Sequence, residues 1–269
     1  MDSYAAVCIA FNTNNSLYVG NIVNNKWKIT EIIFDQKFSK IYKALNIISN
    51  DVVIIKTDNS LHIQNESEVY KMLVNIPGFP IVHYMSDILV MEYIGTSLFE
   101  LYKQKYITLN FVLKIASQMI DRISVLHTKG FIHCDIKPGN FLMSKDNLIY
   151  LIDFGVSHAY INKTGKHITC SKNVPFRGTY KYSSINALNG YKQSRRDDME
   201  SLGYVLISFL IDLPWSNIKD KQKIIDIKTN TAILTNGIPI QFKKYMDYIK
   251  SLKFKDEPDY EYLKSLFMS

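Results

Sequence analysis

Cysteine is scarce in this chain of 269 residues, and the three cysteines present are widely separated. Cys8, Cys134 and Cys170 form no Cys-x-x-Cys pair, and their number is odd. A disulfide framework needs paired cysteines and a structural zinc site needs clustered ones, so the sequence indicates neither. Free, scattered thiols fit a reducing compartment.

Long apolar runs are also missing. No run approaches the roughly 20 residues that cross a bilayer. The first ten residues carry Asp2 instead of a basic flank, and their apolar run is too short for a signal peptide. Internal repeats and low-complexity linkers are absent as well. We therefore expect a monomer of the cytoplasm or the nucleus, without membrane association.

The composition is that of a globular protein with a basic excess. Apolar residues make up 47% of the chain and charged residues 21%. Such a length permits one large domain, or two lobes around a shared cleft. The net charge of +7 favours anionic partners such as nucleotides or phosphopeptides. A solvated basic surface explains the charge equally well, and no motif indicates nucleic acid.

Hydrophobic periodicity predicts a β-rich first third and a mainly helical remainder, an α+β protein. A sustained helical period runs through 109–129, and Gly130 is well placed to end that helix. The boundary between the two parts is predicted near Gly95. The predicted strands are 16–22, 26–34, 41–47, 51–57, 87–93 and 148–152; the predicted helices are 66–75, 109–129, 198–210, 242–252 and 260–267.

The most informative stretch runs from His133 to Asn140 and is followed by Asp153-Phe154-Gly155. Asp135 can accept the proton of an attacking hydroxyl group, and Lys137 can neutralise charge on a moving phosphoryl group. Asn140 and Asp153 carry oxygens that can hold magnesium. These residue types at these spacings predict phosphoryl transfer from a metal-bound nucleotide.

From about Lys26 onward, the chain resembles a eukaryotic-type protein kinase. Within the kinases it is most similar to the casein kinase 1 group, because Ser184-Ile185-Asn186 stands where other kinases carry Ala-Pro-Glu. The stretches 194–204 and 213–215 carry the same likeness, and 257–260 resembles the vaccinia-related kinases and their poxviral relatives. The resemblance implies one two-lobed kinase domain over residues 1–269, with a β-rich N-lobe at about 1–94 and a mainly helical C-lobe at about 95–269.

The resemblance also implies the cofactors ATP and Mg²⁺ and a role for each site residue. Asp135 would be the catalytic base beside Lys137, and Asn140 and Asp153 would bind the metal. Asp198 would anchor the backbone of the catalytic loop, with His133 packed at its base. The residues implied in ATP binding are Lys56, Glu66, Ile41, Ile54, Met91, Glu92, Ile94 and Leu142.

Lys56 would contact the α- and β-phosphates and be oriented by an ion pair with a helix glutamate. Glu66 matches that glutamate. Glu68 is the alternative, although two residues along a helix it points to a different face.

Substrate choice is implied by a basic cluster. Casein kinase 1 enzymes phosphorylate Ser or Thr near acidic or phosphorylated residues of protein substrates. Lys181 aligns with one of their anion-binding arginines, and Arg177 is nearby in sequence. Lysine offers phosphate a point charge without the bidentate fork of arginine. The resemblance therefore predicts acidic or phosphate-primed sites, and solvated surface lysines are the alternative.

Three departures from the kinase pattern leave two hypotheses open. Phe34, Gln36 and Ser39 fill the positions of the glycine-rich loop, where glycine lets the backbone approach phosphate. Ile54 replaces an alanine and should narrow the adenine pocket. Cys134 replaces an arginine that binds activation-loop phosphate, which argues against such switching. The chain is thus either an active kinase with weakened nucleotide binding or a pseudokinase that acts as a regulatory protein-binding module.

Overall fold

The computed structural model describes residues 8–9, 17–36 and 39–268. The chain divides into two compact units, Met1–Ile94 and Gly95–Ser269, which we describe in turn. Predictions on residues 1–7, 10–16 and 37–38 lie outside the described residues. Two predictions are affected. The first is that residues 1–10 are not a signal peptide, of which the structure describes only 8–9, and the second is the beginning of the predicted strand 16–22.

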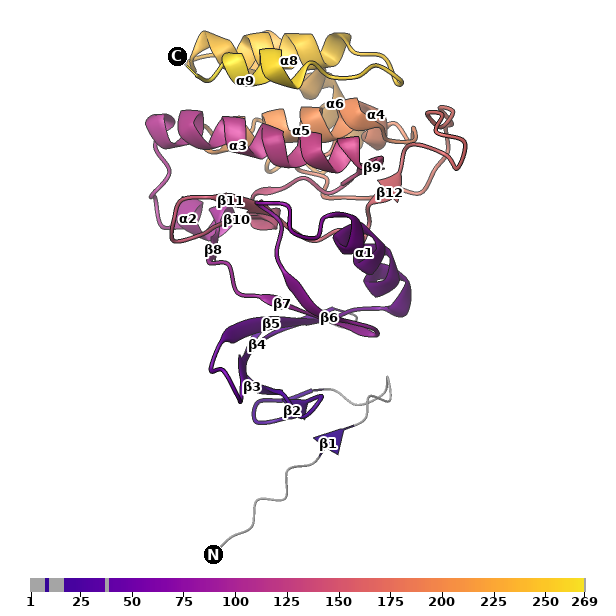
Figure 1. Cartoon of the computed structure of the whole chain (residues 1–269). Helices are drawn as coiled ribbons and strands as arrows, with labels where there is room; N and C mark the ends of the chain where they lie inside the picture. Colours follow the sequence, from indigo (N-terminus) through magenta and orange to yellow (C-terminus); the bar gives the residue numbers. More distant parts are fainter. Residues whose placement is uncertain (1–7, 10–16, 37–38, 269) are drawn as a thin grey trace, which may run out of the picture. The chain divides into compact units, whose positions relative to one another are not determined.

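The N-terminal unit is built on a seven-stranded sheet with strand order β1-β2-β3-β4-β5-β7-β6 (Figure 1). The pairing of β1 with β2 is parallel, and the other neighbours are antiparallel. The strands are β1 (Cys8–Ile9), β2 (Ile22–Val23), β3 (Trp27–Asp35), β4 (Lys40–Asn46), β5 (Val52–Thr57), β6 (Val82–Met85) and β7 (Ile88–Glu92).

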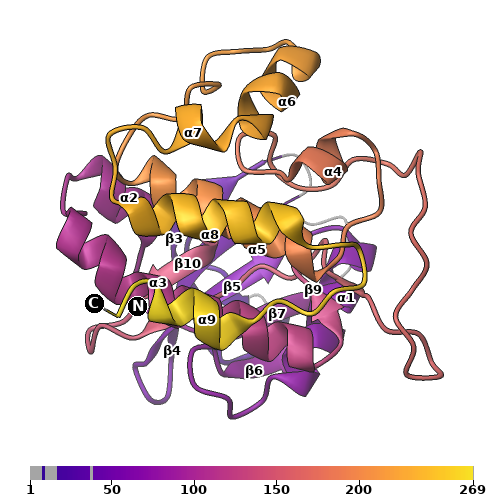
Figure 2. The same cartoon turned by 90° about the horizontal axis from the view of Figure 1, so that it is seen from above.

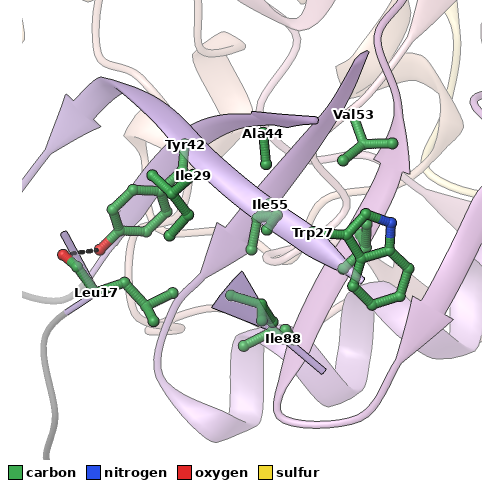
Figure 3. Close-up of a cluster of buried hydrophobic side chains, with 10 residues drawn as sticks. Leu17, Trp27, Ile29, Tyr42, Ala44, Val53, Ile55 and Ile88 are labelled. Carbon is green, nitrogen blue, oxygen red and sulfur yellow. Dashed lines mark hydrogen bonds between the residues drawn. The ribbon is translucent and has the colours of Figure 1, made fainter. Parts of the chain in front are cut away.

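Alternating side chains from the central strands form the core of this sheet (Figure 3). Trp27 and Ile29 of β3 are buried while the residues between and after them are exposed. Ala44 and Ile55 continue the same layer on β4 and β5, and each is fully buried. Alternating or continuous apolar residues predicted these strands, and the predictions for β3, β4, β5 and β7 are confirmed to within two residues.

The predicted strand 16–22 is wrong for residues 17–21. Tyr18 and Asn21 are joined by two hydrogen bonds, so this stretch forms a turn, and pairing begins only at Ile22. The predicted turn at Asn24-Asn25 is confirmed, and both residues have a positive φ. Strand β6 was not predicted.

Helix α1 (Ser60–Met72) begins six residues before its predicted start at 66. Asn59 caps it by accepting a hydrogen bond from the backbone N–H of His62, a start signal that the apolar period alone does not show. The helix also ends at Met72, well before Pro77. Glu66 consequently lies in the middle of α1 on its buried face.

The C-terminal unit is mainly helical. Its long interior helix α5 is buried from Asp197 to Ser208, as predicted for 198–210. Gly203 permits close packing, since a Cβ there would lie 2.3 Å from the sulfur of Met246. Its helices are α2 (Leu98–Lys103), α3 (Leu109–Thr128), η1 (Pro138–Asn140), α4 (Ile185–Leu188), α5 (Arg195–Ser208), α6 (Lys221–Thr229), α7 (Thr231–Leu234), α8 (Ile240–Ser251) and α9 (Tyr260–Ser265).

Helices α8 and α9 form an outer layer of this unit and pack on α5 and α3, respectively (Figure 2). The prediction for α3 is confirmed, including its end, because Gly130 follows with φ of +85°. Short strands connect the helices: β8 (Thr96–Ser97), β9 (Phe131–Ile132), β10 (Phe141–Met143), β11 (Ile149–Leu151) and β12 (His158–Ala159). The predicted strand 148–152 corresponds to β11.

Across the residues that are described, we find no helix with the length and apolar character needed to span a bilayer.

Candidate active site

A buried ion pair joins β5 to α1 in the N-terminal unit. Lys56 Nζ lies 2.7 Å from Glu66 Oε2, and the two side chains are 9% and 1% exposed. Glu68 instead pairs with Lys71 at 3.0 Å on the exposed face of α1. Of the two candidate glutamates, Glu66 is therefore the one that orients Lys56.

Removing Glu66 should destabilise the N-terminal unit. We expect Glu66→Ala to lower the free energy of unfolding by about 3 kcal/mol, because the buried ammonium of Lys56 loses its ion pair with Glu66. Glu68→Ala is the matched control on the same helix, and its exposed pair is worth well under about 1 kcal/mol. Urea unfolding of the two variants measures the difference. Equal losses would show that the Lys56–Glu66 pair does not stabilise the unit.

The other predicted adenine-contacting residues of this unit lie on neighbouring strands. Ile41 of β4 pairs with Lys56 of β5, and Ile54 of β5 pairs with Met91 of β7. Because side chains alternate along a strand, Ile54 and Lys56 share one face of β5. Met91 is 6% exposed, whereas Ile41 and Ile54 are half-buried. This face therefore combines the lysine predicted to contact phosphate with apolar side chains, among which Ile54 is larger than the expected alanine.

Two more of the predicted ATP-binding residues lie at the end of the N-terminal unit, and a third lies in the C-terminal unit. Glu92 ends β7, and its carboxylate accepts a hydrogen bond of 2.8 Å from the backbone N–H of Ile81. Ile94 is the last residue of the unit and is half-buried. Leu142 lies on β10 of the C-terminal unit and is also half-buried.

The hairpin that replaces the glycine-rich loop is present without its glycines. Phe34 pairs with Ile41, and Asp35 forms an ion pair of 3.0 Å with Lys40. The backbone N–H of Gln36 donates to the carbonyl of Ser39, which closes the turn. The residues on both sides of 37–38 thus keep the hairpin pairing, and the part of the predicted loop at 37–38 lies outside the described residues.

The loop 133–140 of the C-terminal unit, which is the predicted catalytic loop and is called so below, holds Asp135 between two donors. Its Oδ2 lies 2.5 Å from Lys137 Nζ, and its Oδ1 accepts a hydrogen bond of 2.7 Å from Thr179 Oγ1. Asn140 Nδ2 donates to the backbone carbonyl of Asp135 at 2.9 Å. The Asp135 carboxylate is therefore fixed in position and its negative charge is compensated, and 12% of its side chain is exposed.

Asn140 and Asp153 are brought close by the backbone. The N–H of Ile152 donates to the carbonyl of Asn140 at 3.0 Å, so that Asp153 follows directly on this bond. Within the described residues, no cluster of three or more His, Cys, Asp or Glu side chains could hold a metal. Mg²⁺ is commonly held by only one or two protein oxygens together with phosphates and water. One amide and one carboxylate fit this ion when a nucleotide supplies the other ligands.

Asp198 anchors the backbone of the catalytic loop. Its carboxylate accepts hydrogen bonds from the N–H groups of His133 at 2.7 Å and Cys134 at 2.9 Å. His127 Nε2 lies 2.9 Å away and supplies a third donor, because Tyr260 donates its hydroxyl to His127 Nδ1. Asp198 and its three donor residues are buried, and Tyr260 is half-buried. The architectural role predicted for Asp198 thus matches its contacts.

These contacts keep Asp198 ionised. Burial alone would raise the pKa of its carboxyl group, but the hydrogen bonds from His127 and the backbone outweigh burial and lower the pKa below 3.8. Burial lowers the pKa of His127, so this imidazole is neutral at pH 7. An ionised carboxylate with three donors explains how the loop keeps Cys134 at a φ of +68°.

His133 packs at the base of the loop, in line with its predicted structural role. It is fully buried, its Nε2 lies 3.0 Å from the carbonyl of Ile152, and its ring lies 5.4 Å from that of Phe154. Cys134 is buried too, and burial raises the pKa of its thiol. Gly178 passes close by, since a Cβ there would meet the Cys134 carbonyl at 2.5 Å.

A basic pocket of about 420 Å³ adjoins the catalytic loop. Arg177, Lys192 and His158 line it, and its other lining residues include no carboxylate. His158 is joined to the loop through a 3.3 Å contact between its Nδ1 and Cys134 Sγ. Burial, followed by the charge of Arg177, lowers the pKa of His158 to about 4. The pocket thus presents two cations and a neutral imidazole.

Of the two residues predicted to bind a substrate anion, one lines the basic pocket. Arg177 lies in the basic pocket, whereas Lys181 is not among its lining residues. The Lys181 ammonium lies 5.6 Å from the ring of Tyr182. Lys192 is also near Lys181 in sequence, whereas His158 comes from an earlier segment and was not predicted; the fold brings it to Arg177.

Residues 27–259 match the family model described as protein kinase domain. The match covers most of the chain and includes Lys56, Glu66, Asp135, Asn140 and Asp153.

Proposed function

Because the chain belongs to the protein kinase domain family, we propose that it is an active Ser/Thr protein kinase that phosphorylates protein substrates with ATP. Its fold is the α+β fold of that family, with a β-sheet N-lobe and a helical C-lobe. We take residues 1–269 as a single kinase domain whose lobes are the two units. The observation that carries the proposal is Asp135, a carboxylate positioned by both Lys137 and Thr179.

In this proposal, some residues act on the hydroxyl group of the acceptor protein and on the transferred phosphoryl group, and others bind the nucleotide and its metal ion. Asp135 accepts the proton of the substrate hydroxyl group as it attacks, and Lys137 compensates charge on the transferred group. Asn140 and Asp153 would hold Mg²⁺, and Lys56, oriented by Glu66, would contact the α- and β-phosphates. The metal ion, when bound, neutralises the developing charge on the phosphate oxygens.

We further propose membership of the casein kinase 1 group, near the vaccinia-related kinases, with acidic or phosphate-primed sites as substrates. The Ser184-Ile185-Asn186 triplet supports the group, and Ser184 caps α4 by accepting from the N–H of Ala187. The basic pocket supports the substrate preference, because Arg177 and Lys192 lie together without a lining carboxylate.

A pseudokinase is the second candidate, and the loop above the nucleotide face favours it. Phe34, Gln36 and Ser39 keep side chains where the glycine-rich loop has none. Phe34 is 38% exposed and sits opposite Ile41. These residues and Ile54 would weaken nucleotide binding without changing the catalytic loop.

A Mg-ATP titration followed by thermal unfolding separates the two candidates. We expect no stabilisation at about 10 μM nucleotide and clear stabilisation at millimolar concentrations, because binding adds RT ln(1 + [L]/Kd) to the stability. Lys56→Met is the control and should remove the shift. Phosphorylation of casein should appear at the same millimolar nucleotide concentrations.

Two outcomes would change the proposal. A large shift at micromolar ATP would show that the altered loop and Ile54 do little harm. Absence of any shift at millimolar Mg-ATP, together with absence of casein phosphorylation, would favour the pseudokinase.

A further inference from the structure

Lys228 is a fully buried lysine near the C-terminal end of α6. Its Nζ donates to the carbonyls of Ser183 at 2.6 Å and Tyr180 at 3.4 Å. The rings of Tyr204 and Trp215 lie 4.5 and 4.9 Å from the ammonium. In the part of the chain that the structure describes, no carboxylate lies within ion-pair distance of it.

The charged groups around Lys228 do not replace such a partner. Glu200 of α5 is close enough to raise the pKa of Lys228, but its Oε1 already accepts from the N–H of Ile185 and the hydroxyl of Tyr204. Lys250 of α8 lies on the other side, donates to the backbone carbonyl of Lys228 and repels the ammonium. Burial dominates, and it lowers the pKa of Lys228 to about 7.

A lowered pKa means that the buried charge opposes folding. The unfolded chain keeps the proton up to pH 10.5, whereas the folded chain releases it near pH 7. Between these values the unfolded state binds more protons, so stability rises with pH through this window. At pH 7 and below, the ammonium carries its full desolvation cost. Stability of the fold therefore does not account for a lysine at this position.

Lys228 binds segment 180–183, which directly follows Thr179, the residue that donates a hydrogen bond to Asp135. Lys228 donates hydrogen bonds to the carbonyls of Tyr180 and Ser183. Trp215 Nε1 donates to the carbonyl of Lys181 at 2.8 Å. We call Lys228 and Trp215 the carbonyl clamp. The clamp binds three of the four backbone carbonyls from 180 to 183. The bonds from the Lys228 ammonium are the stronger ones, because charged donors form stronger hydrogen bonds than neutral donors.

A short chain of hydrogen bonds connects the clamp to Asp135. Ser183 donates both its N–H and its hydroxyl to the carbonyl of Thr179, at 3.0 and 2.9 Å. Thr179 in turn donates its hydroxyl to Asp135 Oδ1. Any shift of Ser183 is therefore passed to the carboxylate of the base through one intervening residue.

We propose that Lys228 is a positioning residue, which sets the conformation of segment 179–184 and through Thr179 the orientation of Asp135. The proposal rests on the proposed kinase function only for its catalytic consequence. A protein substrate must bring its hydroxyl group to Asp135, and segment 179–184 adjoins that carboxylate. Lys228 thus acts on how the acceptor protein is presented and not on the nucleotide.

Hydrogen exchange tests the structural half of this proposal without substrate or nucleotide. Lys228→Met keeps the length of the side chain but removes its charge and its donors. We expect the amides of Tyr182 and Ser183, which donate to the Thr179 carbonyl, to exchange about tenfold faster in this variant. Lys221→Met is the matched control, an exposed lysine on the same helix. Equal exchange in the two variants would overturn the proposal.

Kinetics test the catalytic half. In Lys228→Met we expect kcat/KM for a protein acceptor to fall about tenfold, with KM for ATP unchanged and the unfolding temperature not lowered. An equal rise in both KM values, or loss only in proportion to unfolded protein, would show a merely structural role. If Lys228→Met does not fold, Lys228→Gln keeps a donor without the charge and should give intermediate effects. A wild-type chain without kinase activity would refute the proposed function, while hydrogen exchange would still decide the positioning role.

Discussion

Replacing Asp135 by asparagine is expected to lower the rate of casein phosphorylation by about a thousandfold, the scale of a lost general base. An amide can still accept the hydrogen bond from Thr179 through its oxygen. Its NH₂ group, however, meets the Lys137 ammonium where Oδ2 now lies, and it cannot accept a proton from the attacking hydroxyl. The variant should therefore fold and bind Mg-ATP as the wild type does, yet transfer almost no phosphate.

Asp146→Asn serves as the control for this experiment. Asp146 is exposed on the turn between β10 and β11 and touches none of the catalytic residues, so its loss should leave the rate unchanged. Radiolabel transfer from ATP to casein, at millimolar nucleotide, measures all three proteins. Residual activity in Asp135→Asn equal to that of the wild type would reject Asp135 as the base.

Loss of Asp198 should have the largest effect on stability. We expect Asp198→Ala to lower the free energy of unfolding of the C-terminal unit by about 5 kcal/mol. Three buried donors, from His127, His133 and Cys134, would lose their acceptor at about 1–3 kcal/mol each, with partial relaxation. Because the loop would also lose its anchor, activity should fall even in the fraction of molecules that remain folded. Urea unfolding and casein phosphorylation on the same preparations measure the two effects.

The pH dependence adds a second criterion for Asp198. Its folded pKa is lowered, so its contribution is complete above the unfolded value of 3.8 and is lost as pH falls through the folded pKa. The stability gap between the wild type and Asp198→Ala should thus stay constant from pH 5 to 8 and narrow only below about pH 4. Asp212→Ala, at an exposed aspartate just beyond α5, should show little loss at any pH. A gap that closes near pH 6 would mean that Asp198 is not held ionised.

Local patterns predicted much of the fold. Helix α3 shows its period in one uninterrupted run and ends at Gly130, because the apolar stripe and the left-handed stop are both written in adjacent residues. Helix α1 has a weaker apolar face, and its first two residues, Ser60 and Leu61, are exposed. Its start depends on the capping side chain of Asn59, so hydrophobic spacing placed it too late.

The candidate site divides in the same way. Asp135, Lys137 and Asn140 belong to one short loop, and their contacts with one another follow from their spacing. Thr179 is 44 residues from Asp135 along the chain, and Lys228 is 45 residues from Ser183. These long-range contacts depend on how the helices and loops pack, and residue spacing in the sequence does not predict them. The candidate site residues, and the supporting roles of Asp198 and Glu66, were therefore predicted from the sequence, whereas Thr179 and Lys228 were not.

The anchoring of the catalytic loop by Asp198 also has a consequence for synthesis of the chain on the ribosome. Asp198 lies 65 residues after His133 and 71 after His127, so the loop emerges long before its acceptor. Until α5 has been made, the backbone N–H groups of His133 and Cys134 have only water to bond to, and the loop has no reason to adopt its bent form. Closing such long-range contacts is slow compared with forming a helix. The loop thus becomes ordered only after α5 has been made, and a fragment that stops before Asp198 contains the side chains of the loop that are predicted to be catalytic but lacks the residue that arranges them.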